Sequence, residues 1–168
     1  MATTGSAFPT SGTSVDRAGS TAWTDPGNVV SNNGAEATAA VPTDYLLCTG
    51  FNFTVPVGAI ILGVQVAVEA SETGSGASNY IPQLISDTTP TLIGSAKSAV
   101  AVSGPTPTVS VNGSGVDLWG ATLTPAIVNG SGFGVAIWSE DTTNTLAIDY
   151  VAIEVSYTGS RLAALGVG

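Results

Sequence analysis

Paired carboxylates are the side chains of this sequence with the clearest capacity for chemistry, because two carboxylates can hydrolyse a glycosidic bond. Three acidic pairs lie close together in the sequence: Glu69 with Glu72, Glu140 with Asp141, and Asp149 with Glu154. Glu69, Glu140 and Asp141 fall at predicted strand ends or turns, where carboxylates are usually solvated, and no Lys or Arg lies nearby to position a substrate. We therefore predict that the protein is not an enzyme. Asp149 stands among apolar neighbours, and we expect it to accept hydrogen bonds from a turn or the backbone.

A metal site and a reactive thiol are the next possibilities. Oxygen ligands for calcium could come from one short segment that contains Asp25, Asn28, Asn32 and Asn33. Calcium needs six to eight oxygens, and no recognisable calcium loop is present, so a turn rich in Asx residues is the favoured interpretation. Cys48 lies in an apolar Tyr-Leu-Leu-Cys run, and the chain has no His to activate it. We predict that Cys48 is a small core residue, and we expect no cofactor and no metal.

Two tryptophans are candidate ligand-stacking residues. Trp119 and Trp138 could each offer the broad apolar face of an exposed indole to a sugar ring. The alternative is that each of them, like Trp23, fills or closes the core. The core interpretation is favoured for all three side chains.

Charge is scarce along the chain, since only 9% of the 168 residues are Asp, Glu, Lys or Arg, against roughly a quarter in ordinary soluble domains. With a mean hydropathy of +0.38, this predicts an exterior that lies largely against other protein chains. The net charge of −9 comes from twelve acids against Arg17, Lys97 and Arg161, and it would repel a phosphate backbone, so we expect no nucleic-acid partner. The longest apolar stretch, 57–68, is too short to cross a bilayer. No membrane anchor and no secretory signal are predicted.

Alternating apolar residues predict an all-β fold. Valines at 64, 66 and 68 follow Leu62 at every second position, and the same period recurs over 133–137 and 151–157. A change of face within the last run predicts a β-bulge near Tyr150. Further strands are predicted at 45–48, 51–55, 80–86, 98–102 and 108–112. One helical turn is possible at 124–129, with Thr124 as N-cap and Pro125 at the first helical position. About eight short strands fit a two-sheet antiparallel β-sandwich or jelly roll.

Three parts of the chain are distinguished by composition. Residues 1–22 are mostly Ala, Thr, Ser and Gly, with too little apolar surface to fold alone. We predict that they form an extended N-terminal arm held by a neighbouring subunit. The β-sandwich domain is predicted over 23–159, and a C-terminal tail over 160–168.

Three segments between residues 23 and 159 follow one another in a recognisable order. They are Trp23-Thr-Asp-Pro-Gly-Asn28; Gly50-Phe-Asn-Phe-Thr-Val-Pro-Val-Gly-Ala-Ile-Ile-Leu-Gly-Val-Gln-Val-Ala-Val68; and Asp117-Leu-Trp-Gly120 with Gly132-Phe-Gly-Val-Ala-Ile137 and Ile148-Asp-Tyr-Val-Ala-Ile-Glu-Val-Ser-Tyr157. In this order and spacing they resemble a β-sandwich module of tailed-bacteriophage virion proteins. The resemblance implies a non-enzymatic role in the virion, as capsid decoration or as a tail- or fibre-associated module.

Together, composition and resemblance predict a capsid decoration (cement) protein. We expect a homotrimer that binds the major capsid protein on the outer surface of the virion and stabilises the head, because an acidic protein suits the outside better than the DNA-facing interior. One alternative is a carbohydrate- or receptor-binding module of a tail fibre, in which Trp119 or Trp138 stacks on sugar. A tail-tube subunit is the other.

Overall fold

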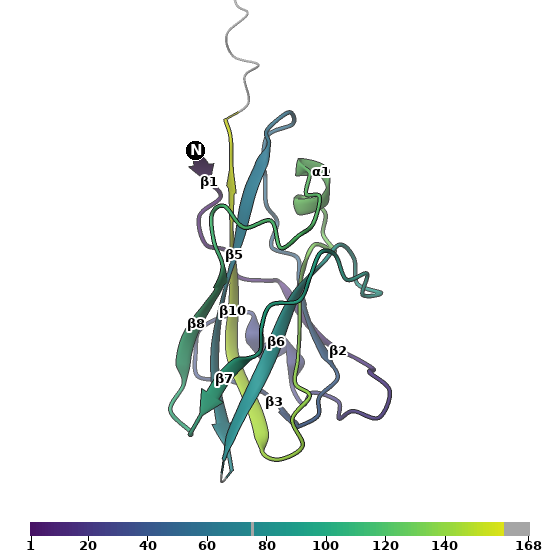
Figure 1. Ribbon diagram of the computed structural model, residues 1–168, viewed down its shortest axis with the longest axis vertical. Coiled ribbons are helices and arrows are strands. Elements are labelled where there is room, and N and C mark those ends of the chain that lie inside the picture. The colour runs from purple at the N-terminus through teal and green to yellow at the C-terminus, as the bar shows by residue number, and fades with distance from the viewer. Residues whose placement is uncertain (75, 160–168) are drawn as a thin grey trace, which may run out of the picture.

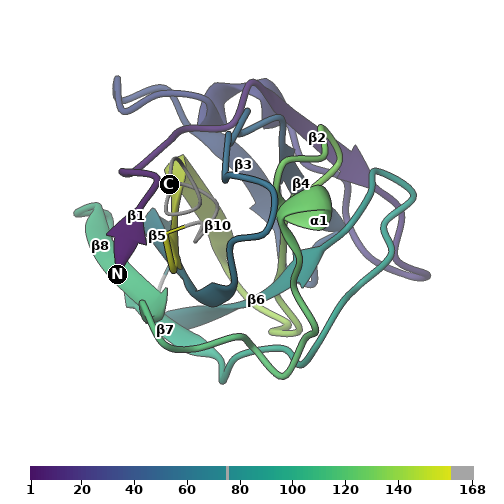
Figure 2. The same ribbon diagram turned by 90° about the horizontal axis from the view of Figure 1, so that it is seen from above.

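The computed structural model describes residues 1–74 and 76–159, and its strands form two antiparallel sheets packed face to face. The first sheet contains β1 (Ala2–Thr3), β3 (Ala37–Ala40), β10 (Thr145–Tyr157), β5 (Ile61–Thr73) and β8 (Thr108–Gly113). The second contains β2 (Ser11–Val15), β4 (Tyr45–Thr49), β9 (Gly134–Trp138), β6 (Ala77–Ile85) and β7 (Val100–Ser103). The strands run along the long axis (Figure 1), and the view along this axis shows the two layers (Figure 2). The predicted β-sandwich is confirmed.

The core lies between the sheets and is built from the predicted period-two faces. Inward-facing residues of β5, β9 and β10, together with Phe133 directly before β9, are fully buried: Val64, Val66 and Val68; Phe133, Val135 and Ile137; Val151, Ile153 and Val155. Each such side chain contributes about 1.5 to 3 kcal/mol when it leaves water. The pairing of β10 with β5 shifts by one residue between Ile148 and Tyr150. This confirms the predicted bulge and brings Ile148 and Val151 to the same core.

Strand β9 departs from the prediction of a half-buried strand, because all five of its residues are buried. The outer face of its sheet carries a second, small apolar cluster of Leu47, Ile85 and Ala136. Val15, Tyr45 and Leu92 pack over that cluster. Because this central strand is covered on both faces, apolar residues replace the polar ones that a half-buried strand would have at alternate positions.

The strand predicted at 51–55 is wrong. Phe51, Phe53 and Val55 alternate with exposed residues and are buried as expected, but Asn52 adopts a left-handed φ of 55° that breaks an extended run. The side chain of Asn129 takes the place of a strand partner. Its Oδ1 accepts from the Val55 N–H and its Nδ2 donates to the Val55 carbonyl, each at 2.8 Å.

The extended arm predicted for residues 1–22 is also wrong, since this segment joins both sheets of its own chain. Strand β1 pairs with β10, and β2 pairs with β4 over its full length. Between them the Ala7 N–H donates to the Ile153 carbonyl at 2.9 Å, and the Thr10 N–H donates to the Thr49 carbonyl at 3.0 Å. Backbone pairing at a sheet edge needs no apolar side chains, so composition alone does not reveal it.

Within the described part of the chain, two short helices lie outside the sheets. The single turn α1 (Pro125–Val128) begins as predicted, with the Thr124 hydroxyl accepting from the Ile127 N–H at 3.3 Å. A 3-10 turn, η1 (Pro26–Val29), packs against β2, β3 and β10. No helix within the described residues is long and apolar enough to span a membrane. The tail predicted at 160–168 lies outside the described residues.

Candidate functional site

Trp119 is part of the core. Its side chain is 1% exposed, its indole N–H donates to the Val64 carbonyl at 2.8 Å, and its backbone N–H donates to Asp117 Oδ1 at 2.8 Å. The Lys97 ammonium lies 4.7 Å from the ring centroid and forms an ion pair of 2.5 Å with Asp117. Because the indole ring is almost fully buried, neither of its faces is open to a sugar, so the stacking interpretation of Trp119 is wrong.

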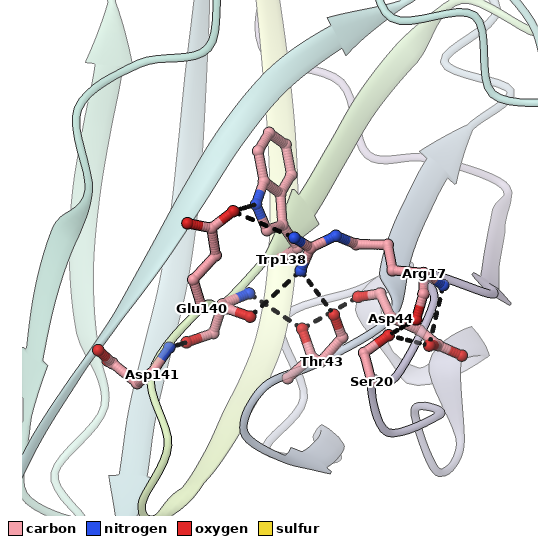
Figure 3. A network of polar contacts seen from close by, with 8 residues as sticks. Arg17, Ser20, Thr43, Asp44, Trp138, Glu140 and Asp141 are labelled. Atoms are coloured by element: carbon pink, nitrogen blue, oxygen red, sulfur yellow. Dashed lines mark hydrogen bonds and ion pairs between the residues drawn. The ribbon is translucent and has the colours of Figure 1, made fainter.

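Trp138 is enclosed in a similar way and belongs to the polar network of Figure 3. It is 7% exposed, and its ring and that of Tyr45 form a T-shaped pair with centroids 5.3 Å apart. The Arg17 guanidinium lies 5.6 Å from its centroid, and Glu140 Oε1 accepts from its indole N–H at 3.4 Å. Trp23 is also buried and donates to the Asp44 carbonyl at 2.9 Å. The core interpretation therefore describes all three tryptophans.

Arg17 is the centre of this network and was not recognised from the sequence. Its Nη1 donates to the carbonyls of Thr43 (3.1 Å) and Ser139 (3.4 Å), and its Nη2 pairs with Glu140 at 3.1 Å. These partners flank β4 and β9, whereas Arg17 follows β2 (Figure 3). The network holds the N-terminal segment on the second sheet.

Buried Asp44 completes the same attachment from the other side. It accepts from the Arg17 N–H at 3.2 Å, from the Ser20 hydroxyl at 2.6 Å and from the Ser14 hydroxyl at 3.3 Å. The segment that contains these donors closes over the carboxylate. This arrangement satisfies a buried charge and fixes a loop, as expected of a structural network.

The six acids of the predicted pairs do not assemble into one site. Glu72 is buried and accepts from the Gly104 N–H, Asp141 accepts from the backbone and side chain of Asn79, and Glu140 binds Arg17. Asp149 lies in the bulge and accepts from the Gly34 N–H at 3.1 Å, which confirms its expected backbone role. The half-buried Glu69 lies near Asp149 and Glu36, and burial together with these two negative charges raises its pKa.

The Asx-rich segment forms turns, as predicted. Asn28 Nδ2 donates to the Glu36 carbonyl at 3.0 Å, and Asn33 Oδ1 accepts from the Ala35 N–H at 2.8 Å. Within residues 1–74 and 76–159 no three His, Cys, Asp or Glu side chains are grouped to hold a metal ion. Cys48 is fully buried in the core, as expected, and burial raises the pKa of its thiol.

Exposed apolar side chains are the surface feature that most resembles a functional site. Of the eight large apolar side chains exposed within the described residues, five lie at two places. One end of the sandwich, where β5 begins and β1 pairs with the end of β10, carries Met1 (85% exposed), Val57 (85%) and Ile60 (65%), which we call the apolar end. The free edge of the first sheet carries Val109 and Val111 on β8. The sequence gives no signal that these valines face outward, because alternation alone does not say which face is buried.

A shallow hollow of about 210 Å³ lies between the N-terminal segment and residues 51–54. Its lining includes the side chains of Thr3, Thr4, Asn52, Thr54 and Tyr157, without a charged residue. Such a surface could contact a neutral polar ligand.

Comparison with known proteins gives a structural likeness but no match in sequence. No family model matches the chain, and no curated protein shows a significant match. Among solved structures, the CBM22-1 xylan-binding domain from Paenibacillus barcinonensis Xyn10C aligns with 92% of this chain and 94% of its own, at 13% identity and a TM-score of 0.38. At this TM-score the likeness says nothing about function, and the sandwich fold rests on the strand pairing described above.

Proposed function

We propose that the protein is a structural component of a phage virion, a decoration protein that binds the outer surface of the major capsid lattice and stabilises the head. The observation that carries the proposal is the apolar end: Met1, Val57 and Ile60 are exposed in a chain with little charge to solvate it. Burying a Val or Ile side chain contributes about 1.5 to 3 kcal/mol. The apolar end is therefore the surface we assign to the capsid.

Several features support a decoration role, although none identifies which capsid is bound. The motifs around Trp23, 50–68 and 117–157 resemble a virion module, and the acidic chain suits an outer surface that is remote from DNA. Further copies of the chain are proposed partners, since few charges are left to solvate an isolated subunit. A trimer is the assembly expected from composition.

Binding to capsids that lack the protein tests the proposal. The wild-type protein should co-sediment with these capsids, and the double variant Val57→Glu with Ile60→Glu should bind at least roughly tenfold more weakly, because each carboxylate must be desolvated. Ala40→Glu is the matched control, since Ala40 is exposed and pairs with Thr145 at the opposite end of β10. Wild-type protein that fails to bind, or a copy number of only a few per virion, would replace decoration with a tail or fibre role.

The carbohydrate-binding alternative retains one surface, now that Trp119 and Trp138 are enclosed. The uncharged hollow offers threonine hydroxyls, the Asn52 amide and the Tyr157 ring. Screening against a glycan array decides this alternative. Binding that Tyr157→Ala abolishes in a folded protein would favour it, and no binding to any glycan would remove it.

A further inference from the structure

Strand β8 leaves one edge of the first sheet unpaired. It pairs with β5 on one side, and no backbone group of the described residues bonds to its other side. Figure 1 shows it at the outer flank of the sandwich. Its sequence is Thr-Val-Ser-Val-Asn-Gly, and Val109 and Val111 are 53% and 55% exposed. An uncharged, β-branched strand with a free edge is a template for another strand.

The other edge strands of the described residues are protected from pairing, whereas β8 is not, and β1 has only two residues. Strand β3 is covered by Thr24, which exchanges two backbone hydrogen bonds with Thr38. Strand β2 packs against η1, and β7 has only four residues. Proteins usually protect an edge with a charge, a proline, a bulge or a short strand. Within β8 there is no charge and no proline, and its pairing with β5 has no register shift.

Charge indicates what kind of strand fits this edge. The chain carries a net charge of −9, yet β8 offers no charge to an acidic or basic partner. A second copy of β8 is uncharged as well. Glu69 lies opposite Val109 on β5, one strand away from the edge. In a paired dimer the two β5 strands would lie about 14 Å apart, which exceeds the screening length of about 10 Å at 0.1 M salt.

We propose that β8 is a self-association edge, at which two copies of the chain pair their β8 strands antiparallel about a twofold axis. The two first sheets then form one continuous sheet across the dimer. The contact closes with two copies, so it gives a dimer where composition predicts a trimer. It does not depend on the capsid-binding role.

The side-chain pattern fixes the register. Paired residues share a face of the sheet, so the outward Val109 and Val111 must meet outward residues, and the inward Asn112 must meet an inward one. A register centred on Ser110 places Val109 opposite the second copy's Val111 and buries both valines against valines. A register centred on Val111 leaves Val109 opposite glycine. The first register buries more apolar surface and is the one we infer.

The contact is small, because β8 has only six residues and a stable interface usually buries about 1,600 Å² in total. We therefore expect the protein to be a monomer in dilute solution and to form the dimer only at high protein concentration. It would strengthen wherever copies are held side by side, because the second contact is then intramolecular.

Sedimentation of the full chain from about 1 μM to about 1 mM tests the proposal. The wild-type protein should pass from monomer to dimer, and Val109→Lys with Val111→Lys should weaken the dimer at least roughly tenfold. Both valines are exposed, so thermal unfolding should show that the variant stays folded. Val57→Lys at the apolar end is the matched control and should dimerise like the wild type. A wild-type monomer at about 1 mM, or an oligomer of any size that the double variant leaves intact, overturns the proposal.

Disulfide trapping tests the register. Opposed residues of an antiparallel pair lie within the Cα separation that a disulfide needs, and the only native cysteine, Cys48, is fully buried. The double variant Val109→Cys with Val111→Cys should give a covalent dimer under mild oxidation, and neither single variant should. Efficient crosslinking by Val111→Cys alone, or none by the double variant, would overturn the register centred on Ser110.

Discussion

At the scale of single residues, the largest side chains of this protein act by filling space and donating hydrogen bonds to other groups of the same chain. Each tryptophan directs its indole N–H to a partner inside the chain: Trp23 to the Asp44 carbonyl, Trp119 to the Val64 carbonyl and Trp138 to the Glu140 carboxylate. A buried carbonyl that lost such a donor would cost about 1 to 3 kcal/mol. Substituting these residues therefore tests stability rather than ligand binding.

Glu69 gives the clearest pH-dependent prediction. Its pKa is raised above the ordinary value of 4.5 by burial and by the charges of Asp149 and Glu36, and its Oε2 is buried without a hydrogen-bond partner. The folded state therefore binds this proton more tightly than the unfolded state. Ionised Glu69 lowers the free energy of unfolding at neutral pH, and this penalty disappears as pH falls through the raised pKa to below 4.5.

We expect Glu69→Gln to raise the free energy of unfolding at pH 7 by up to about 1 kcal/mol, with no gain at about pH 4. Urea unfolding of both proteins at the two pH values measures this difference. Glu154→Gln is the matched control for the loss of one negative charge from the same sheet. An equal gain from both variants would assign the effect to net charge, and a loss from Glu69→Gln would contradict the predicted sign.

At the scale of elements, the sequence predicts the strands whose side chains alternate and misses those held by the backbone. Strands β5, β9 and β10, the bulge before Tyr150 and the Thr124 cap follow from residue pattern and were confirmed. Strands β1 and β3 are only two and four residues long, and β2 is rich in Ser and Gly, so none has a detectable period. These strands form because they pair with strands that are distant in the sequence.

The residues of the candidate site also fall into those whose roles can be predicted from their sequence neighbours and those whose roles cannot. The core roles of Cys48 and Trp23 follow from the residues around them, whereas the exposure of Val109 and Val111 depends on which face of β8 meets the second sheet. Arg17 could not be identified either, because its partners lie at positions 43, 139 and 140, far along the chain.

Arg17 gives a prediction for the N-terminal segment as a whole. Arg17→Ala removes two hydrogen bonds to backbone carbonyls and the contacts with Tyr45 and Trp138, and should lower the free energy of unfolding by about 1 to 2 kcal/mol. Glu140→Ala should cost less than about 1 kcal/mol, because the Glu140 side chain is 62% exposed. Urea unfolding measures both values. Equal losses would mean that the ion pair, rather than the carbonyl contacts, holds the segment.

At the scale of the whole molecule, the net negative charge opposes the proposed β8 dimer, whereas the exposed valines favour it. Two copies with a net charge of −9 each repel one another over distances that salt shortens. We expect the dimer to be weakest at low ionic strength and to strengthen as NaCl rises from about 20 mM to about 150 mM, with little change beyond. Sedimentation across this range measures the effect. A dimer that dissociates as salt is added would point to ion pairs at the contact instead of valines.

The place of β10 in the first sheet has a consequence for synthesis on the ribosome. Among the strands of the described residues it is the last to be made, yet it lies between β5 on one side and β1 and β3 on the other. Until it leaves the exit tunnel, β1 and β3 lack the strand with which they pair in this sheet, and β5 has only β8 beside it. The first sheet therefore cannot close progressively from its N-terminal strand, and the faces that β10 covers stay exposed to chaperones until that strand emerges.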